Sequence, residues 1–299
     1  MQVLITGGSG FVGRFLTDLL LQKGYAVTAL GGHSHDNQAL HPNYRYVVAD
    51  TSKQGEWQKL VAEQDALINL AGRSVFHLWS DSYKKQIYDS RILTTRNLVE
   101  ALPQDNGPRV LVSTSAAGFY GNGGEDDLDE NAGPGHDFLA RVCTDWESEA
   151  RAAEKKGVRV ALTRFGVVLG AGGGALQTMR LPFQLGLGGS IGSGKQWFPW
   201  IHLQDLAAAI CWILEGEGLS GPFNCTAPES VRQKEFASSL GRALHRPAFL
   251  PTPAFLMTLL LGEFGASLLQ GQKAVPAALL RSGFSFTFSG LAAALNDLV

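Results

Sequence analysis

The sequence predicts an α/β fold, in which a Rossmann-type, doubly wound parallel sheet is joined to a smaller, mostly helical C-terminal lobe. Three observations predict it. Short β-branched runs alternate with longer helical patterns in the first half of the 299-residue chain, as is typical of parallel βαβ units with right-handed crossovers. A glycine-rich turn separates the first strand from the first helix. The alternation stops after Arg164, where glycine-rich loops begin.

The elements of the sheet domain follow from the hydrophobic period and from the glycines that end the helices. Strands are expected at residues 3–6, 26–30, 44–48, 66–70, 109–112 and 158–164. Helices are expected from residue 12 to a stop at Gly24, over residues 83–102, and over residues 138–156 before Gly157.

The second half is expected to form a substrate-side lobe that interleaves with the sheet domain. Glycines at 172–174 and 186–194 indicate loops. Residues 200–214 predict a short strand and a helix, and residues 223–225 predict a strand that returns to the sheet. We therefore divide the chain into a domain of residues 1–165, with a returning strand near 222–226, and a lobe of residues 166–299.

Composition and charge indicate a globular protein with a substantial core, since 45% of the residues are apolar and 17% are charged. The formal net charge of −2 leaves no electrostatic footprint for nucleic acid or an anionic membrane, so neither partner is expected. Cys143, Cys211 and Cys225 are too few and too scattered for a disulfide framework or a zinc site. No metal is expected, and a reducing, cytoplasmic compartment fits this pattern.

No segment is expected to direct the chain to a membrane or to span one. Met1 leads almost directly into the first strand, without the basic region and cleavage site of a signal peptide. The most apolar stretch, residues 254–269, is broken by Gly262, Glu263 and Gly265 and is too short to cross a bilayer. We interpret it as a buried helix or as a helix that packs against a second subunit of a homo-oligomer.

The turn at residues 7–13 is predicted to bind phosphate. Gly7 permits the tight turn, Gly10 lets a pyrophosphate approach the backbone, and Gly13 lets the helix pack closely on the strand. The helix that begins with Phe11 and Val12 then directs free N–H groups at the phosphates. The turn therefore predicts that residues 1–165 bind a nicotinamide dinucleotide.

The end of the second strand favours NADP(H) over NAD(H) as the cofactor. NAD-preferring versions of this fold have an acidic residue there, whereas this chain has Gly31, Gly32, His33 and Ser34. No carboxylate repels a 2′-phosphate, and the two glycines leave room for one. His33, Ser34 or His35 could donate a hydrogen bond to it, although no arginine stands in this segment.

Five motifs spread over nearly the whole chain carry a family resemblance. They are residues 7–13, Val-Ala-Asp-Thr at 48–51, Asn-Leu-Ala-Gly at 69–72, Ser-Thr-Ser-Ala-Ala-Gly-Phe-Tyr-Gly at 113–121 and Trp-Ile-His-Leu-Gln-Asp at 200–205. Together they resemble the extended short-chain dehydrogenase/reductase superfamily, which contains the sugar-nucleotide epimerases and dehydratases. Residues 187–194 and 271–276, the latter leading to Gly283 and Phe284, resemble an atypical epimerase-like branch with a distinct C-terminal domain.

The resemblance implies further cofactor-binding residues at the ends of the third and fourth strands. Asp50 and Thr51 should lie beside the adenine. Leu70, Ala71 and Gly72 should pass behind the adenosine ribose. Open parallel sheets place ligands at these carboxyl ends, which supports the assignment independently.

Ser115 is expected to end the strand that delivers the catalytic hydroxyl in the enzymes that the chain resembles. Their tyrosine and lysine are missing here, because alignment on Glu147 places Leu139 at the tyrosine position and Cys143 at the lysine position. A phenol with a pKa near 10 needs such a cation to act at neutral pH. Tyr120 is a candidate proton donor, or else a packed aromatic side chain.

Other residues keep two interpretations each. Cys143 is a reactive thiol or an inert buried one, and Asp137 is a site residue or a helix N-cap. Arg164 contacts a cofactor phosphate or neutralises a nearby acid, and Asn69 ties the sheet together or touches the ligand. The resemblance places five residues on the substrate side: Arg73, Trp79, Lys195, Gln196 and His202.

Two classes of function fit these residues. In the first, the protein is an NADP(H)-dependent oxidoreductase or epimerase that acts on a small carbonyl or hydroxyl substrate, such as a sugar nucleotide, without the usual tyrosine and lysine. In the second, it binds NADP(H) without turnover and acts as a regulator or sensor. The missing pair favours the binding protein. The complete set of loops in the substrate lobe favours the enzyme, which is the class that we expect, with the binding protein as the alternative.

Overall fold

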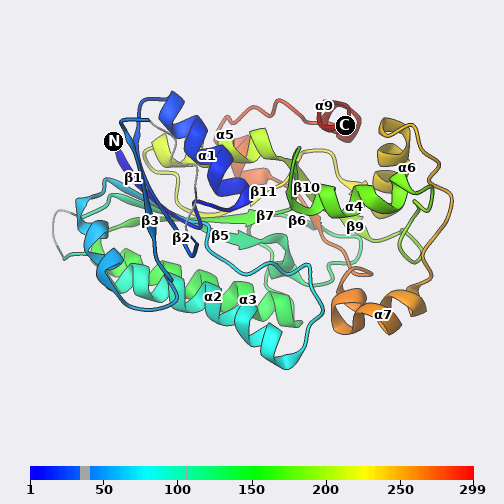
Figure 1. The fold of residues 1–299 in the computed structure, drawn as a ribbon, viewed down its shortest axis with the longest axis horizontal. Helices are drawn as coiled ribbons and strands as arrows, with labels where there is room; N and C mark the ends of the chain where they lie inside the picture. The colour runs from blue at the N-terminus through cyan, green and yellow to red at the C-terminus, as the bar shows by residue number, and fades with distance from the viewer. Residues whose placement is uncertain (34–40, 105–106) are drawn as a thin grey trace.

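A parallel sheet of seven strands lies at the centre of the computed structural model, which describes residues 1–33, 41–104 and 107–299. The strand order is β11-β7-β5-β4-β1-β2-β3 (Figure 1). The strands are β1 (Gln2–Thr6), β2 (Ala26–Gly31), β3 (Tyr44–Val48), β4 (Ala66–Asn69), β5 (Val110–Ala116), β7 (Arg159–Phe165) and β11 (Gly221–Cys225).

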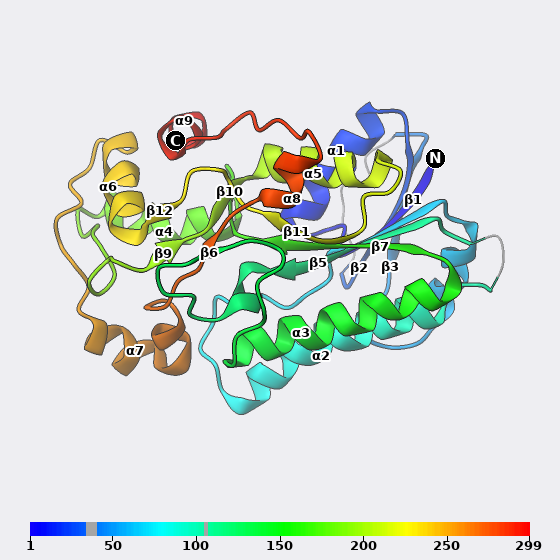
Figure 2. The same ribbon diagram turned by 180° about the vertical axis from the view of Figure 1, so that it is seen from behind.

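Helices cover both faces of the sheet. On one face lie α1 (Phe11–Gln22) and α5 (Leu203–Glu215), and on the other α2 (Asp81–Glu100) and α3 (Phe138–Arg151) run side by side (Figures 1 and 2). Short 3-10 helices are η1 (Glu56–Glu63), η2 (Ala117–Tyr120) and η3 (Ala152–Lys156). Alternation along β1 fits this layering, because Val3 and Ile5 pack with α1 and α5 while Leu4 packs on the other face. The predicted Rossmann-type fold is confirmed.

The strand order defines where a ligand belongs. From β1 the chain moves outward through β2 to β3, then crosses back to place β4 on the other side of β1. Ligands of open parallel sheets bind at the carboxyl ends of the strands beside such a reversal. The predicted returning strand is also present, since β11 pairs in parallel with β7. β5 extends to Ala116, beyond the predicted end, because residues 113–116 pair with β7.

The C-terminal lobe has its own apolar core, to which Leu176, Trp200, Phe236 and Leu295 contribute. Its helices are α4 (Gly174–Gln184), α6 (Gln233–Ala243), α7 (Ala254–Ser267), α8 (Ala277–Arg281) and α9 (Leu291–Leu298). Its paired short strands are β8 (Val167–Leu169) with β10 (Trp200–His202), β9 (Trp197–Phe198) with β12 (Val231–Arg232), and β6 (Asp127–Leu128) with β13 (Lys273–Ala274). The division of the chain at residue 165 stays a prediction.

The interpretation of residues 254–269 as a buried helix is wrong. These residues form α7 and its end, but Phe255 and Leu259 are 71% and 75% exposed. The apolar pattern identifies a helix correctly, yet it does not tell which apolar faces find a partner within the chain.

Candidate functional site

The turn after β1 is shaped by close contacts between backbones. Gly7 has a φ of +70°, and a Cβ there would lie 2.9 Å from the backbone nitrogen of Ala71 and from the carbonyl carbon of Leu70. A Cβ on Gly13 would lie 2.4 Å from the carbonyl oxygen of Gly7. The glycines therefore join the ends of β1 and β4 and press the first turn of α1 onto the loop, as their predicted roles require.

The N-terminus of α1 has no side-chain cap. Gly10 is the N-cap residue, and no side chain accepts a hydrogen bond from the first N–H groups of the helix, so these donors and the positive end of the helix dipole face the strand edge. The ring of Phe11 packs against Gly170, Gly173 and Gly174. A side chain on any of these three glycines would clash with the ring. This packing ties the turn to the loop after β8.

The end of β2 differs in one respect from the prediction. A Cβ on Gly31 would lie 2.2 Å from Tyr46 Oη and 2.4 Å from Ser9 Oγ, so Gly31 leaves no room for a phosphate. Gly32 is open with respect to residues 1–33, 41–104 and 107–299, none of which has an atom within 4 Å of a Cβ at that position. The backbone carbonyl of His33 accepts a hydrogen bond from Tyr46 Oη at 2.7 Å. The predicted contacts of Ser34 and His35 lie outside the described residues.

The ends of β3 and α2 meet at Asp50 and Thr51. The Asp50 carboxylate accepts hydrogen bonds from the hydroxyl and backbone N–H of Ser52, and these bonds, with the nearby Lys53, lower its pKa. Thr51 is buried, and its hydroxyl lies 3.1 Å from that of Thr94. Asp50 is exposed at the edge of the sheet. The adenine contacts of both residues stay a prediction.

Asn69 ties the sheet together, which is the first of its two interpretations. Its side chain is fully buried and accepts a hydrogen bond from Thr6 Oγ1 at 2.6 Å. It donates to Thr95 Oγ1 at 2.8 Å and to Ser113 Oγ at 3.2 Å. Three strands and α2 are thereby held in register directly beneath Leu70.

Arg91 of α2 belongs to this site but is absent from the residues predicted from the sequence. A Cβ added to Gly72 would lie only 3.0 Å from Cζ of Arg91, so the guanidinium group packs against this glycine. Nη1 donates to the carbonyls of Arg73 and Ile87, both at 3.0 Å, and Cζ stands 5.2 Å from the ring centre of Trp146. Burial lowers the pKa of Arg91. Within the described residues it forms no ion pair with a carboxylate, and Nε and Nη2 have no hydrogen-bond partner.

A signal for Arg91 exists in the sequence. It follows Ile87 by four residues and precedes Leu98 by seven, a spacing that places all three on the buried side of α2. Because a charged side chain is rarely buried without a partner, an arginine at such a position indicates a ligand contact or an ion pair.

The hydroxyl of Ser115 is directed into the protein. The residue is 1% exposed, and Oγ donates to Glu147 Oε1 at 2.8 Å. The same carboxylate accepts hydrogen bonds from Nε and Nη2 of Arg164 at 2.8 and 2.9 Å. Although burial opposes it, hydrogen bonding to Glu147 raises the pKa of Arg164. Arg164 thus neutralises an acid, and its prediction as a cofactor contact is corrected. The catalytic role of Ser115 stays a prediction.

Tyr120 is packed within the protein, the second of its two interpretations, and its role as a proton donor stays a prediction. It is 4% exposed. Its hydroxyl lies 2.7 Å from Asn224 Oδ1 and 3.0 Å from the carbonyl of Asp129, and it accepts a hydrogen bond from Arg164 Nη1 at 2.9 Å. Burial raises the pKa of Tyr120. One hydroxyl proton already has two protein acceptors, so none is left for a substrate.

The two positions that replace the usual tyrosine and lysine are apolar or inert. A Cβ on Gly118 would lie 3.4 Å from Leu139 Cβ, so Leu139 packs on the loop after β5. Cys143 is buried, and burial raises its pKa to about 11, which suppresses the thiolate. Asp137 is the N-cap of α3, accepting the N–H of Ala140 at 2.8 Å.

The residues assigned to the substrate side have mainly structural contacts. The Nδ1 atom of His202 caps α5, and Gln196 donates to two backbone carbonyls. The backbone of Arg73 supports Arg91. Trp79 packs against Phe138 and Phe264, with ring centres 5.3 and 5.6 Å apart, and so links the sheet domain to α7.

Residues 1–33, 41–104 and 107–299 contain neither a metal-binding cluster nor a membrane-spanning helix. In that part of the chain, no three His, Cys, Asp or Glu residues gather where they could hold a metal ion. Nor does any helix there have the length and apolar character needed to cross a membrane.

Comparison with known proteins assigns both parts of the chain. Residues 3–225 match the model of the NAD dependent epimerase/dehydratase family, and residues 252–298 match a domain of unknown function, DUF1731. Epimerase family protein YfhF of Bacillus subtilis is 38% identical over 301 residues, covering 100% of this chain and 98% of that protein. The chloroplastic SDR39U1 homolog of Arabidopsis thaliana is 39% identical over 302 residues, covering 100% and 87%.

A solved structure agrees with these relatives. The crystal structure of the human epimerase family protein SDR39U1 (isoform 2) with NADPH has a TM-score of 0.86 and 36% identity, covering 100% of this chain and 99% of that one. The motifs, the sheet and the C-terminal domain thus all agree. This chain belongs to the NAD dependent epimerase/dehydratase family, and its residues 252–298 form a DUF1731 domain.

Proposed function

We propose that this chain binds NADP(H) across the carboxyl ends of β1, β4 and β5. The observation that carries the proposal is the turn at residues 7–13. It combines an uncapped helix N-terminus with glycines whose side-chain space is taken by backbone, which is the arrangement that receives a pyrophosphate. The crystal structure of human SDR39U1 with NADPH supports the same assignment.

Two further features fit a phosphorylated dinucleotide. The guanidinium of Arg91 lies beside Gly72 without a carboxylate partner, so an anionic or hydroxylated group of the cofactor would satisfy its remaining N–H groups. At the end of β2, the open side of Gly32 would leave space for a 2′-phosphate, and residues 31–35 of the sequence contain no acid to repel it. When bound, the nicotinamide would supply hydride-transfer chemistry.

Binding without turnover is the function that the geometry supports best. Ser115, Glu147, Arg164 and Tyr120 satisfy one another, and Cys143 is buried as a thiol. None of these groups is available to move a proton to or from a substrate. NADP(H)-dependent oxidation, reduction or epimerisation of a small carbonyl or hydroxyl compound is the second candidate, favoured by membership of an epimerase family.

The binding proposal is tested by Gly10→Val. A Cβ at Gly10 meets only the carbonyl oxygen of Gly7, at 3.1 Å, so the fold should tolerate the change while the isopropyl group fills the pyrophosphate path. Titration calorimetry should show NADPH affinity reduced by more than about 100-fold, equivalent to about 2.7 kcal/mol. Gly133→Val, at an exposed glycine with no neighbour within 4 Å, is the matched control. Unchanged affinity in Gly10→Val would place the cofactor elsewhere.

The two function classes are separated by following NADPH absorbance with sugar-nucleotide, quinone and small ketone substrates. Binding without turnover predicts no oxidation above background, and NADPH affinity that is nearly the same in Ser115→Ala and Cys143→Ala. If the protein is a reductase, oxidation appears. An epimerase regenerates its cofactor in every turnover, so it is detected instead by chromatography of the sugar nucleotides, which would show a new epimer. A loss of roughly 100-fold in Ser115→Ala would then show that this hydroxyl leaves Glu147 to stabilise developing charge.

A further inference from the structure

The end of the molecule opposite β1–β3 carries an exposed apolar surface, here named the cap face. It combines α7, the end of α4 with the loop that follows it, and the segment between α6 and α7 (Figures 1 and 2). The N–H of Leu250 donates to the carbonyl of Gly188, and that of Gly192 donates to the carbonyl of Thr252, so these segments lie side by side. Its large side chains that are more than 40% exposed are Leu181, Leu185, Leu187, Phe249, Leu250, Phe255, Leu259 and Leu260.

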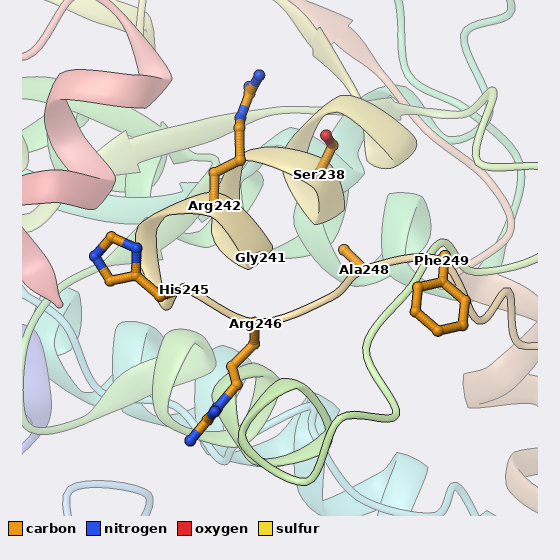
Figure 3. Close-up of a pocket in the computed structure, with 7 residues that line it drawn as sticks. All are labelled: Ser238, Gly241, Arg242, His245, Arg246, Ala248 and Phe249. Atoms are coloured by element: carbon orange, nitrogen blue, oxygen red, sulfur yellow. The ribbon is translucent and has the colours of Figure 1, made fainter.

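A surface hollow of about 540 Å³ opens at the edge of the cap face, where α6 ends. Figure 3 shows its floor at Gly241 and Ala248, from which the cationic side chains fan outward while the Phe249 ring lies on the opposite side. The full lining is Ser238, Gly241, Arg242, His245, Arg246, Ala248 and Phe249. Arg242 and Arg246 are thus directed to opposite sides of the hollow, and the Phe249 ring lies on a third side.

The cations of the hollow have no acidic partner in the described part of the chain. Arg242 donates to Ser239 Oγ, and neither it nor His245 nor Arg246 makes an ion pair there. The sequence explains this, because residues 171–196 contain no acid and residues 236–270 contain only Glu263. Glu263 is itself paired with Lys84 at 2.7 Å. The cap face is therefore locally cationic on a chain whose net charge is −2.

The charge pattern decides between two occupants of the cap face. A two-fold contact with a second copy brings the same surface against itself, so the arginines would meet arginines with no carboxylate to pair with, which disfavours association. An anionic membrane satisfies both features, because its phosphates pair with the cations while exposed Phe and Leu side chains enter the boundary between headgroups and acyl chains.

We propose that the cap face binds the surface of a membrane containing anionic lipids, with Arg242 and Arg246 each paired to lipid phosphates at the edge of that face. The interaction is peripheral, because the side chains that contact the membrane stand on the surface of a folded domain and only they enter the lipid. It departs from the expectation drawn from net charge, which averages over the whole chain and does not describe one end of it.

Flotation of the full chain with vesicles tests the proposal. We expect binding to vesicles of phosphatidylcholine with one third phosphatidylglycerol, none to pure phosphatidylcholine, and weakening as salt is raised. Arg242→Ala combined with Arg246→Ala should weaken binding about 30-fold, at about fivefold per cation. Leu259→Asp should also release the protein from vesicles.

Matched controls are Leu280→Asp and Lys155→Glu, at exposed positions outside the cap face; both should bind like wild type. Circular dichroism confirms that each variant is folded. Equal binding by wild type and the double arginine variant would overturn the proposal. So would an absence of vesicle binding, including the case in which light scattering reveals a dimer that Leu259→Asp dissociates, because the cap face would then bind a second copy.

Discussion

A cation on the buried side of a helix is costly unless a counter-charge or several acceptors compensate for lost water. Arg91 has two carbonyls and the face of Trp146, but no carboxylate within the described residues. Such an incomplete set of hydrogen-bond partners is typical of a ligand-binding residue in a protein without its ligand. Its place beside Gly72 fits the cofactor proposed above as that ligand.

Arg91→Gln should weaken NADPH binding about 10- to 100-fold, the range expected when one hydrogen bond to a charged group is lost. Because Arg91 lies beside Gly72, after β4, and β1 separates β4 from β2 in the sheet, NADH binding should weaken by the same factor. Calorimetric titration with both cofactors measures this. A loss confined to NADPH would instead assign Arg91 to the 2′-phosphate, and an unchanged affinity would make it purely structural.

The residue types in a motif predict where functional side chains lie along the chain better than they predict which side chains those residues contact. The motif at 113–121 correctly places Ser115 at the end of a strand and Tyr120 close after it. It does not reveal that Glu147, two turns further along α3 than Leu139, reaches both Ser115 and Arg164. That meeting depends on how α3 packs across β5 and β7, which no local pattern contains.

At the scale of elements, the sheet was predictable because each strand is a short β-branched run followed by a glycine or polar turn. The end of β2 shows the limit of such patterns. Gly31 and Gly32 look equivalent in the sequence, yet one is packed by Tyr46 and Ser9 and the other is open. The neighbour that distinguishes them comes from β3, through the register that pairs Leu30 with Val47.

Gly32→Asp should therefore change cofactor preference while the fold is kept. The carboxylate would repel a 2′-phosphate and could accept hydrogen bonds from free ribose hydroxyls. We expect the ratio of NADPH to NADH affinity to fall about 10- to 100-fold, as measured by the two dissociation constants before and after substitution. Gly31→Asp is the contrasting variant, because it should destabilise the sheet through its clash with Tyr46. If the ratio does not move in Gly32→Asp, another segment reads the phosphate.

At the scale of the whole molecule, residues 279–288 near the C-terminus pack against the sheet domain and are hydrogen-bonded to it. Asp205 of α5 is 1% exposed, and its two carboxylate oxygens accept the N–H groups of Thr287 and Phe288, both at 2.8 Å. Leu279 and Phe284 belong to the same core cluster as β1 and α1. The chain thus returns to its first part, and residues near the C-terminus complete the core of the sheet domain.

This interleaving predicts that the protein unfolds in a single transition. Far-UV circular dichroism and tryptophan fluorescence should give coincident curves in urea. Asp205→Asn should shift both curves together by about 1–3 kcal/mol, because an amide offers one acceptor where the carboxylate offers two and its NH₂ group then faces a buried N–H. Asp126→Asn, at an exposed aspartate, should change stability by less than about 0.5 kcal/mol. If the fluorescence and dichroism curves separate, or Asp205→Asn shifts only one of them, the C-terminal lobe is an independent folding unit and the core shared by Leu279 and Phe284 contributes little to holding the molecule together.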